Sequence, residues 1–114
     1  RAGIRLYGMK DIVAMKLSAI ADNGTRLKDF VDVACLSTRM SLFDMLRAYG
    51  EKFQSSNPVR PLKGLAFHDD INFKEPIRMV GGDYEWERVK NRINDMLARG
   101  ETVFEELPLV SRKS

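Results

Sequence analysis

Apolar residues recur three and four positions apart along most of this 114-residue chain, and this helical spacing most constrains its fold. The clearest stripe consists of Leu42, Met45, Leu46, Tyr49 and Phe53. Ser41 lies directly before this stripe and Asp44 is three residues further on, which is a variant of the capping box that opens helices. The pattern therefore predicts a helix after Ser41 and a mainly α-helical fold.

Further segments carry helical signals. We predict these helices over residues 9–22, 26–38 and 84–99, with a shorter one beginning at Pro61. Gly8, Thr25 and Asp83 are expected as their N-caps, because residues of these types are preferred at the position directly before a helix. The length allows one domain. We therefore predict one helical domain over residues 1–100, followed by a tail over residues 101–114.

The first residues have a different pattern. Gly3-Ile4-Arg5-Leu6-Tyr7 alternates apolar and polar residues, which is typical of a short β-strand. A lone strand is not stable without partners, and nothing downstream supplies a convincing second strand. The chain also opens on Arg1, with neither an initiator methionine nor a signal-peptide pattern. We therefore expect the partners of this strand to lie outside the chain.

Composition excludes several classes of protein. The single cysteine, Cys35, excludes an internal disulfide framework and a cysteine zinc site. No apolar run approaches the roughly 18 residues of a membrane span. The net charge of +3 lies within residues 1–57, and it is too small to establish nucleic-acid binding but suits a phosphate-bearing ligand. We expect a cytoplasmic protein that has no membrane partner.

Lys16 is an unusual residue for its place on the first predicted helix. On a helical wheel it lies between Ile12 and Ile20, in the middle of the apolar arc, where a lysine is costly unless it is paired or reaches out to water. Asp29 and Asp32 are three residues apart on the next helix and predict a polar cluster between the two helices. Either Lys16 points at a ligand phosphate beside acid/base carboxylates, or it pairs with one aspartate as a structural tie.

Other residues give weaker functional signals. His68-Asp69-Asp70 has the residue types of a metal site, but neighbours in a loop diverge in direction and the chain has no second histidine. Cys35 has no nearby histidine to form a catalytic pair, so it is interpreted as a small buried apolar residue. Trp86 is interpreted as a core anchor of the last helix. We therefore predict no metal ligand in this chain.

Two adjoining motifs carry a family resemblance. Asp11-Ile-Val-Ala-Met-Lys16-Leu-Ser-Ala-Ile20, followed by Lys28-Asp29-Phe-Val-Asp32, resembles the AbiEii-type nucleotidyltransferases. These are toxin-like proteins of bacterial abortive-infection and type IV toxin–antitoxin systems. The segments 41–53 and 65–70 also resemble the parts of the family that follow these motifs.

The resemblance implies an enzyme that transfers a nucleotide from a nucleoside triphosphate, with Mg²⁺ bound by carboxylates of an N-terminal α/β domain. It implies that Lys16 contacts the nucleotide and that Asp29 and Asp32 are catalytic. The chain contains neither the Gly-Ser dipeptide nor the Asp-x-Asp triplet of that domain. We therefore expect the helical C-terminal domain of a nucleotidyltransferase-fold protein with a short N-terminal strand, residues 1–8, as the residual strand of the missing catalytic domain. On its own this chain is expected to be inactive and without bound cofactors.

The resemblance also implies three partners, which are a nucleotide, an RNA acceptor and an antitoxin protein. An alternative function is a non-catalytic helical module that binds nucleic acid or a partner protein through its basic first half. A third possibility is a structural domain in which Lys16 is bonded to Asp29 or Asp32. These alternatives differ in what they expect of Lys16, which is essential for activity only in the first.

Overall fold

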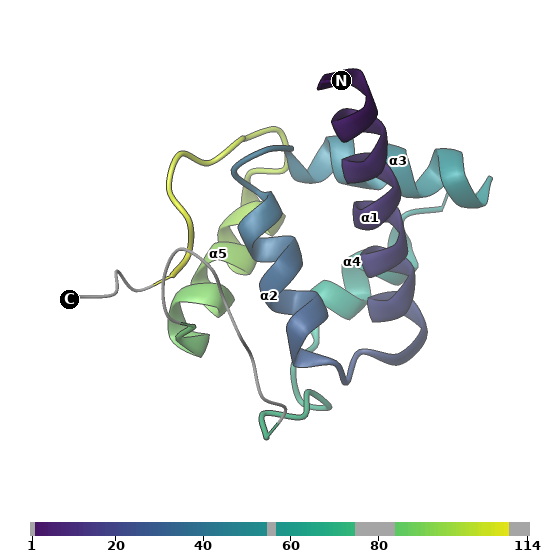
Figure 1. Cartoon of the computed structure of the whole chain (residues 1–114). Helices are drawn as coiled ribbons and strands as arrows, with labels where there is room; N and C mark the ends of the chain where they lie inside the picture. The colour runs from purple at the N-terminus through teal and green to yellow at the C-terminus, as the bar shows by residue number, and fades with distance from the viewer. Residues whose placement is uncertain (1, 55–56, 75–83, 110–114) are drawn as a thin grey trace.

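The computed structural model describes residues 2–54, 57–74 and 84–109, with side chains from residue 8 onward (Figure 1). Within these residues the chain forms α1 (Ala2–Asn23), α2 (Leu27–Leu36), α3 (Leu42–Phe53), α4 (Val59–Ala66) and α5 (Trp86–Ala98). No strand is present in this described part. The prediction of a mainly α-helical fold is therefore confirmed.

The predicted N-terminal strand is wrong. Helix α1 begins at Ala2, so residues 3–7 belong to its first turns. Alternation over five residues is too short to exclude a helix, and Leu6 lies three positions before Met9, which continues the helical spacing of the segment. Gly8, which was expected as the N-cap, lies inside α1.

One predicted helix cap, Ser41, is confirmed, and another, Thr25, is wrong. The Ser41 hydroxyl accepts a hydrogen bond of 3.1 Å from the backbone N–H of Asp44, so the cap of α3 is confirmed. Thr25 does not cap α2, because that helix starts after Arg26, which makes no side-chain cap bond. The carbonyl of Thr25 instead accepts the backbone N–H of Asn72 at 2.8 Å, which holds Thr25 in the connecting segment. Asp83 lies outside the described residues.

Helix α1 is the centre of the packing. It contacts α2, α3 and α4, while α5 packs on α2 and α4 (Figure 1). The core contains residues from every helix, among them Val13, Leu17, Phe30, Met45, Leu65 and Ile93. Helices α1 and α4 approach closely at Gly64, where an added Cβ would lie 2.8 Å from the carbonyl oxygen of Ile20. The fold therefore fixes α1 against three neighbouring helices and sets Lys16 beside α2.

The segment that follows α5 has no helix over residues 101–109, but it packs against the helical core. The backbone N–H of Phe104 donates to the carbonyl of Ser37 at 2.9 Å. The guanidinium of Arg92 lies 4.4 Å from the centre of the Phe104 ring, and Leu109 is buried. This segment therefore covers the C-terminal end of α2. None of the described helices is both long enough and apolar enough to cross a membrane.

Candidate functional site

Helices α1 and α2 bring together the three residues that the sequence singled out. The Nζ atom of Lys16 lies 3.2 Å from Oδ1 of Asp29 and 2.9 Å from Oδ2 of Asp32. Two further cations contact the two aspartates. Lys28 Nζ lies 3.2 Å from Asp32 Oδ2, and Arg26 Nε lies 3.9 Å from Asp29 Oδ2. These five residues form one charged group, which we call the Lys16 cluster. The predicted polar cluster between the first two long helices is therefore present.

The members of the Lys16 cluster differ in their access to solvent. The side chain of Asp29 is 5% exposed, whereas those of Asp32 and Lys16 are 21% and 25% exposed. Burial of an unpaired carboxylate is costly, so the bond to Lys16 stabilises Asp29 in its buried position. Asp32 and Lys16 are therefore accessible to a ligand, and Lys16 connects Asp32 to the buried Asp29.

Lys16 lies at the edge of the buried face of α1, not at its centre as the helical wheel predicted. Val13, Leu17 and Ile20 are buried, but Ile12 is 52% exposed. Because Ile12 is outside the core, the buried arc is shifted away from Lys16. The apolar character of Ile12 misled the wheel, since an exposed apolar residue and a buried one look alike in sequence.

Two opposing effects act on the pKa of Lys16. Burial alone would lower it, because burial disfavours the charged ammonium. Hydrogen bonds and charge attraction from Asp32 and Asp29 outweigh this effect and raise the pKa above its ordinary value of 10.5. Lys16 is therefore a fixed positive charge at physiological pH, suited to binding an anion and unsuited to general-base chemistry.

A cavity opens beside the Lys16 cluster, and Asp32 belongs to both. It has a volume of about 480 Å³ and is lined by Met9, Ile12, Asp32, Cys35, Leu36, Thr38, Arg39 and Leu107. We call it the Asp32 cavity. Its wall is formed by α1, by α2, by the segment that follows α2 and by the segment that follows α5. It combines aliphatic and thioether groups with a carboxylate and a guanidinium.

Cys35 lines the Asp32 cavity but is not a reactive thiol. Burial, together with the nearby charge of Asp32, raises the pKa of Cys35 from 9.0 to about 11. The thiol is therefore protonated at physiological pH and does not act as a nucleophile. Cys35 was interpreted as a small buried apolar residue, but it is only half-buried.

The residues around His68 do not form a second site. The His68 ring packs edge-on against Phe30 and Trp86, with ring centres 5.8 and 5.1 Å away. Its Nε2 lies 2.7 Å from the carbonyl oxygen of Leu65, while Asp69 and Asp70 are exposed. His68 is therefore a packing residue that joins α2 to the start of α5.

The described residues do not fit a Mg²⁺ site. They hold no group of three or more His, Cys, Asp or Glu side chains that could bind a metal ion. Asp29 and Asp32 each face a lysine ammonium, which competes with a metal cation. The sequence does contain one Asp-x-Glu triplet, Asp83-Tyr84-Glu85, whose Asp83 lies outside the described residues and whose Glu85 pairs with Arg88 at 3.3 Å.

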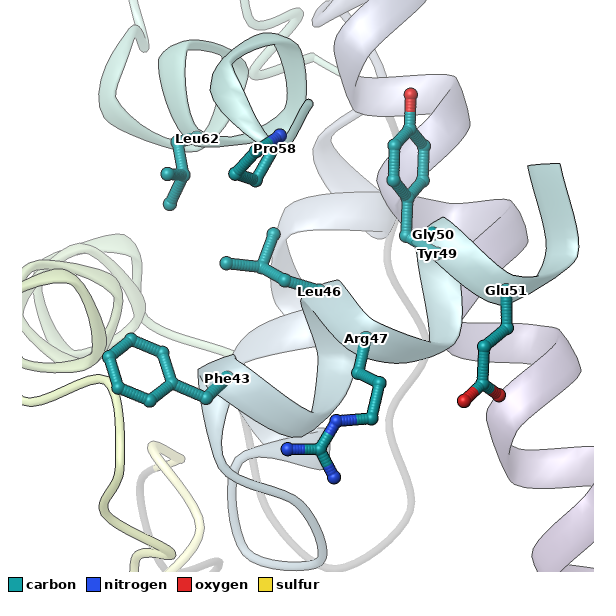
Figure 2. Close-up of a pocket in the computed structure, with 8 residues that line it drawn as sticks. All are labelled: Phe43, Leu46, Arg47, Tyr49, Gly50, Glu51, Pro58 and Leu62. Carbon is teal, nitrogen blue, oxygen red and sulfur yellow. The ribbon is translucent and has the colours of Figure 1, made fainter. Parts of the chain in front are cut away.

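A second hollow lies between α3 and α4, with a volume of about 560 Å³ (Figure 2). Leu46 of α3 points toward Pro58 and Leu62, and Phe43 lies on the same side, whereas the charged groups of Arg47 and Glu51 point away. The hollow shares no residue with the Lys16 cluster. It is an apolar groove without a charged group aimed into it.

Sequence reasoning gave no separate role to Arg26 or Lys28. Both carry a detectable signal, because Arg26 is three residues before Asp29 and Lys28 is four residues before Asp32, which are the spacings of ion pairs on one helix face. The exposed Arg39 and the contribution of Leu107 to the cavity have no such local signal, since both depend on how distant segments pack.

A comparison with protein families matched most of the chain. A family model described as nucleotidyl transferase AbiEii toxin, type IV TA system, matches residues 1–106. Neither the curated proteins nor the solved structures gave a match. The matched region includes all five helices, the Lys16 cluster and every residue of the Asp32 cavity except Leu107. From this match over almost its whole length, we conclude that the chain belongs to the AbiEii nucleotidyltransferase toxin family.

Proposed function

We propose that this chain supplies the nucleotide-phosphate contacts of a nucleotidyltransferase-type toxin, as its helical C-terminal domain, and that Lys16 makes the central contact. The observation that carries the proposal is the position of the Lys16 ammonium between Asp29 and Asp32, on a side chain that is 25% exposed. A lysine that is fixed at a ligand-accessible edge by two carboxylates is preorganised for an anion.

The hydrogen-bonding capacity of Lys16 supports this role. A lysine ammonium has three N–H donors, and Asp29 and Asp32 account for two of them. The third donor is free to bind a phosphate oxygen without loss of the ion pairs. Lys28, whose side chain is 45% exposed, adds a second positive charge beside the same carboxylates. The cluster therefore offers a triphosphate two ammonium groups on adjacent helices.

The two aspartates take different roles in this proposal. Asp32 is exposed to the cavity, so it is the catalytic candidate, positioned to accept the proton of an acceptor hydroxyl. Asp29 is buried, so it acts as a positioning residue that holds Lys16. Both were expected to be catalytic from the family resemblance, and their unequal exposure is the reason for separating them.

Magnesium would neutralise the triphosphate and polarise the reacting phosphate when bound. Because the described residues do not fit a Mg²⁺ site, we propose that its carboxylate ligands lie elsewhere in the protein and that these residues alone do not transfer a nucleotide. The proposed acceptor is RNA, and the type IV toxin–antitoxin description of the family leads us to propose an antitoxin partner.

A non-catalytic module that binds a partner protein or nucleic acid is the second candidate. It is favoured by two large apolar side chains that α1 leaves on its surface, Ile12 at 52% and Met15 at 57% exposure. In that case the ion pairs of Lys16 would serve as a tie between α1 and α2. This candidate predicts that loss of the Lys16 ammonium leaves toxicity and binding unchanged.

The test is nucleotide transfer by the protein in its full encoded length, assayed with labelled nucleoside triphosphates, Mg²⁺ and RNA. Lys16→Ala should lower transfer by about 100-fold, the size of effect that follows loss of one transition-state contact. Lys52→Ala is the matched control, because Lys52 pairs with a single surface aspartate, Asp11, at 2.8 Å. Normal transfer by a folded Lys16→Ala protein would contradict the proposal.

A further inference from the structure

We propose that one face of α3 binds the same face of a second copy of this chain, in an antiparallel two-fold contact between the two α3 helices. This face consists of Phe43, Arg47 and Glu51 together with the hollow between α3 and α4 (Figure 2). We call it the α3 face. It shares no residue with the Lys16 cluster or the Asp32 cavity, so the proposal goes beyond the proposed function and does not depend on it.

Phe43 is a large apolar residue that is held in a fixed position while it is 55% exposed. Its backbone N–H donates to the carbonyl of Gly100 at 2.9 Å, and a Cβ added at Gly100 would overlap the Phe43 ring, so the ring rests against Gly100. A side chain that is ordered before association loses little conformational entropy when it binds, and aromatic residues often dominate the binding energy of an interface. Phe43 therefore has the properties of an interface anchor.

A hollow that can accept such an anchor lies on the same face. It has a volume of about 560 Å³, and its apolar wall includes Leu46 of α3 and Pro58 and Leu62 of α4. Figure 2 shows Leu46 pointing toward Pro58 and Leu62, with Phe43 on the same side of α3. In a two-fold contact each copy presents the same surface to the other, so a projecting residue and its acceptor must lie on one face. The α3 face meets this requirement.

Arg47 and Glu51 make the α3 face complementary to itself in charge. They are four residues apart on α3, and Figure 2 shows both charged groups on one side of the helix. In an antiparallel pair of α3 helices whose two-fold axis passes between them, each Arg47 faces the Glu51 of the other copy. A parallel pair would instead place like charges opposite each other. Among the described residues Glu51 has no cation within ion-pair distance, and Arg47 has only the exposed Asp44, at 3.6 Å, so both charges are available to a partner.

The charges of α3 also favour a second copy over another partner. Asp44 and Glu51 balance Arg47 and Lys52, so α3 is neutral although the whole chain carries a net charge of +3. Two copies therefore meet at this face without net repulsion. A different partner needs only a complement to the anchor or to the hollow. An anchor, a hollow and both signs of charge on one face are what a copy of the same surface requires.

The contact is small, which sets the expected affinity. Helix α3 has 12 residues and is therefore about 18 Å long. Two such helices with the adjoining edges of α4 form an interface at the low end of the range for specific complexes. We therefore expect a reversible dimer with a dissociation constant in the micromolar range.

The test is charge reversal, with the dimer dissociation constant measured by analytical ultracentrifugation of the protein in its full encoded length, at concentrations up to about 100 μM. Arg47→Glu and Glu51→Arg each place like charges opposite each other twice, so each variant alone should dimerise at least about tenfold more weakly. An equimolar mixture of the two variants restores both opposite-charge pairs and should associate within about threefold of wild type. Arg88→Glu on α5 is the matched control and should dimerise as wild type does, because Arg88 is exposed and pairs with Glu85 at 3.3 Å.

A second pair of variants tests the anchor. Phe43→Ala should weaken dimerisation by at least about tenfold, the effect of truncating an aromatic residue at the centre of an interface. Phe67→Ala should leave the dissociation constant within about twofold of wild type, because Phe67 is 50% exposed but does not line the hollow of the α3 face. Thermal melting checks that each variant is folded.

Each outcome supports or overturns the proposal. Wild type that stays monomeric at about 100 μM would overturn it and leave the α3 face to a different occupant. Unchanged dimerisation of folded Arg47→Glu or folded Phe43→Ala would show that the dimer uses another face. Failure of the mixed charge-reversal variants to associate would overturn the antiparallel pairing. Dimers that are lost in each charge-reversal variant and recovered in their mixture support the proposal.

Discussion

Lys16 on α1 holds the buried carboxylate of Asp29 on α2, with 3.2 Å between Nζ and Oδ1. Asp29 is 5% exposed, and its other charged neighbour, Arg26, is more distant at 3.9 Å. A carboxylate in this position depends on its lysine, because an unpaired buried charge is costly. The same lysine reaches Asp32 and the solvent, so one ammonium links the packing of two helices to a ligand-accessible surface.

The unequal burial of the two aspartates predicts unequal effects on stability. Asp29→Asn should lower the free energy of unfolding by about 1–3 kcal/mol, because it removes a charge-assisted bond in a buried place. Asp32→Asn should cost only about 0–1 kcal/mol, because its pairs with Lys16 and Lys28 are partly exposed. Urea denaturation of both variants measures the difference. A larger loss for Asp32→Asn would contradict the assignment of Asp29 as the positioning residue.

Substitution of two glycines by alanine should have opposite effects on stability, because only Gly64 lies where α1 and α4 approach closely. Gly64→Ala should destabilise the fold by about 1–3 kcal/mol, because the new Cβ would lie 2.8 Å from the carbonyl oxygen of Ile20. Gly8→Ala in α1 has nothing within 4 Å of its Cβ and should stabilise by about 0.5–1 kcal/mol through helix propensity. Thermal unfolding of both variants checks this, and stabilisation by Gly64→Ala would rule out the close helix contact.

Two of the predicted caps, Ser41 and Thr25, provide a second matched pair. Ser41→Ala should cost about 1 kcal/mol, because it removes the acceptor for the backbone N–H of Asp44. Thr25→Ala should change the free energy of unfolding by less than about 0.5 kcal/mol, because α2 starts after Arg26 and takes no side-chain cap. Chemical denaturation distinguishes the two. Equal losses for both variants would show that Thr25 does cap α2.

The raised pKa of Cys35 predicts slow alkylation. A thiol with a pKa of about 11 contains little thiolate at pH 8, so iodoacetamide should label native Cys35 at least about tenfold more slowly than urea-unfolded chain. Because the folded state holds this proton more tightly, the contribution to stability is constant below pH 9 and is lost as pH rises from 9 to about 11. Mass spectrometry measures both labelling rates. Equal rates for the native and the urea-unfolded chain at pH 8 would contradict the raised pKa.

Local patterns made most of the fold predictable from sequence. The stripe in α3 and the cap at Ser41 act within one helix, and both are confirmed. The strand prediction failed because alternation in residues 3–7 fits a helix as well, and only the longer spacing through Met9 decides between them. The cap at Thr25 failed because Asn72, which is far away in sequence, takes part in the connection.

The candidate site was predictable in its charges but not in its shape. Lys16, Asp29 and Asp32 stand out because charged residues are rare on apolar helix faces, and their contact is now observed. The edge position of Lys16 was not predictable, because the wheel treats exposed Ile12 as buried. The Asp32 cavity requires Leu107 to pack beside α1 and α2, which no local pattern encodes. Their roles in nucleotide transfer stay predictions.

The central claim is that the Lys16 ammonium binds nucleotide phosphates, and its most direct measurement is the tripolyphosphate dissociation constant of two matched variants of the full-length protein. Asp29→Asn keeps the ammonium on Asp32, whereas Asp29→Asn with Lys16→Met removes it without leaving Asp29 charged and unpaired. We predict that Asp29→Asn binds at least as tightly as wild type and that the double variant binds at least about tenfold more weakly. Equal affinity of the two folded variants would contradict the claim.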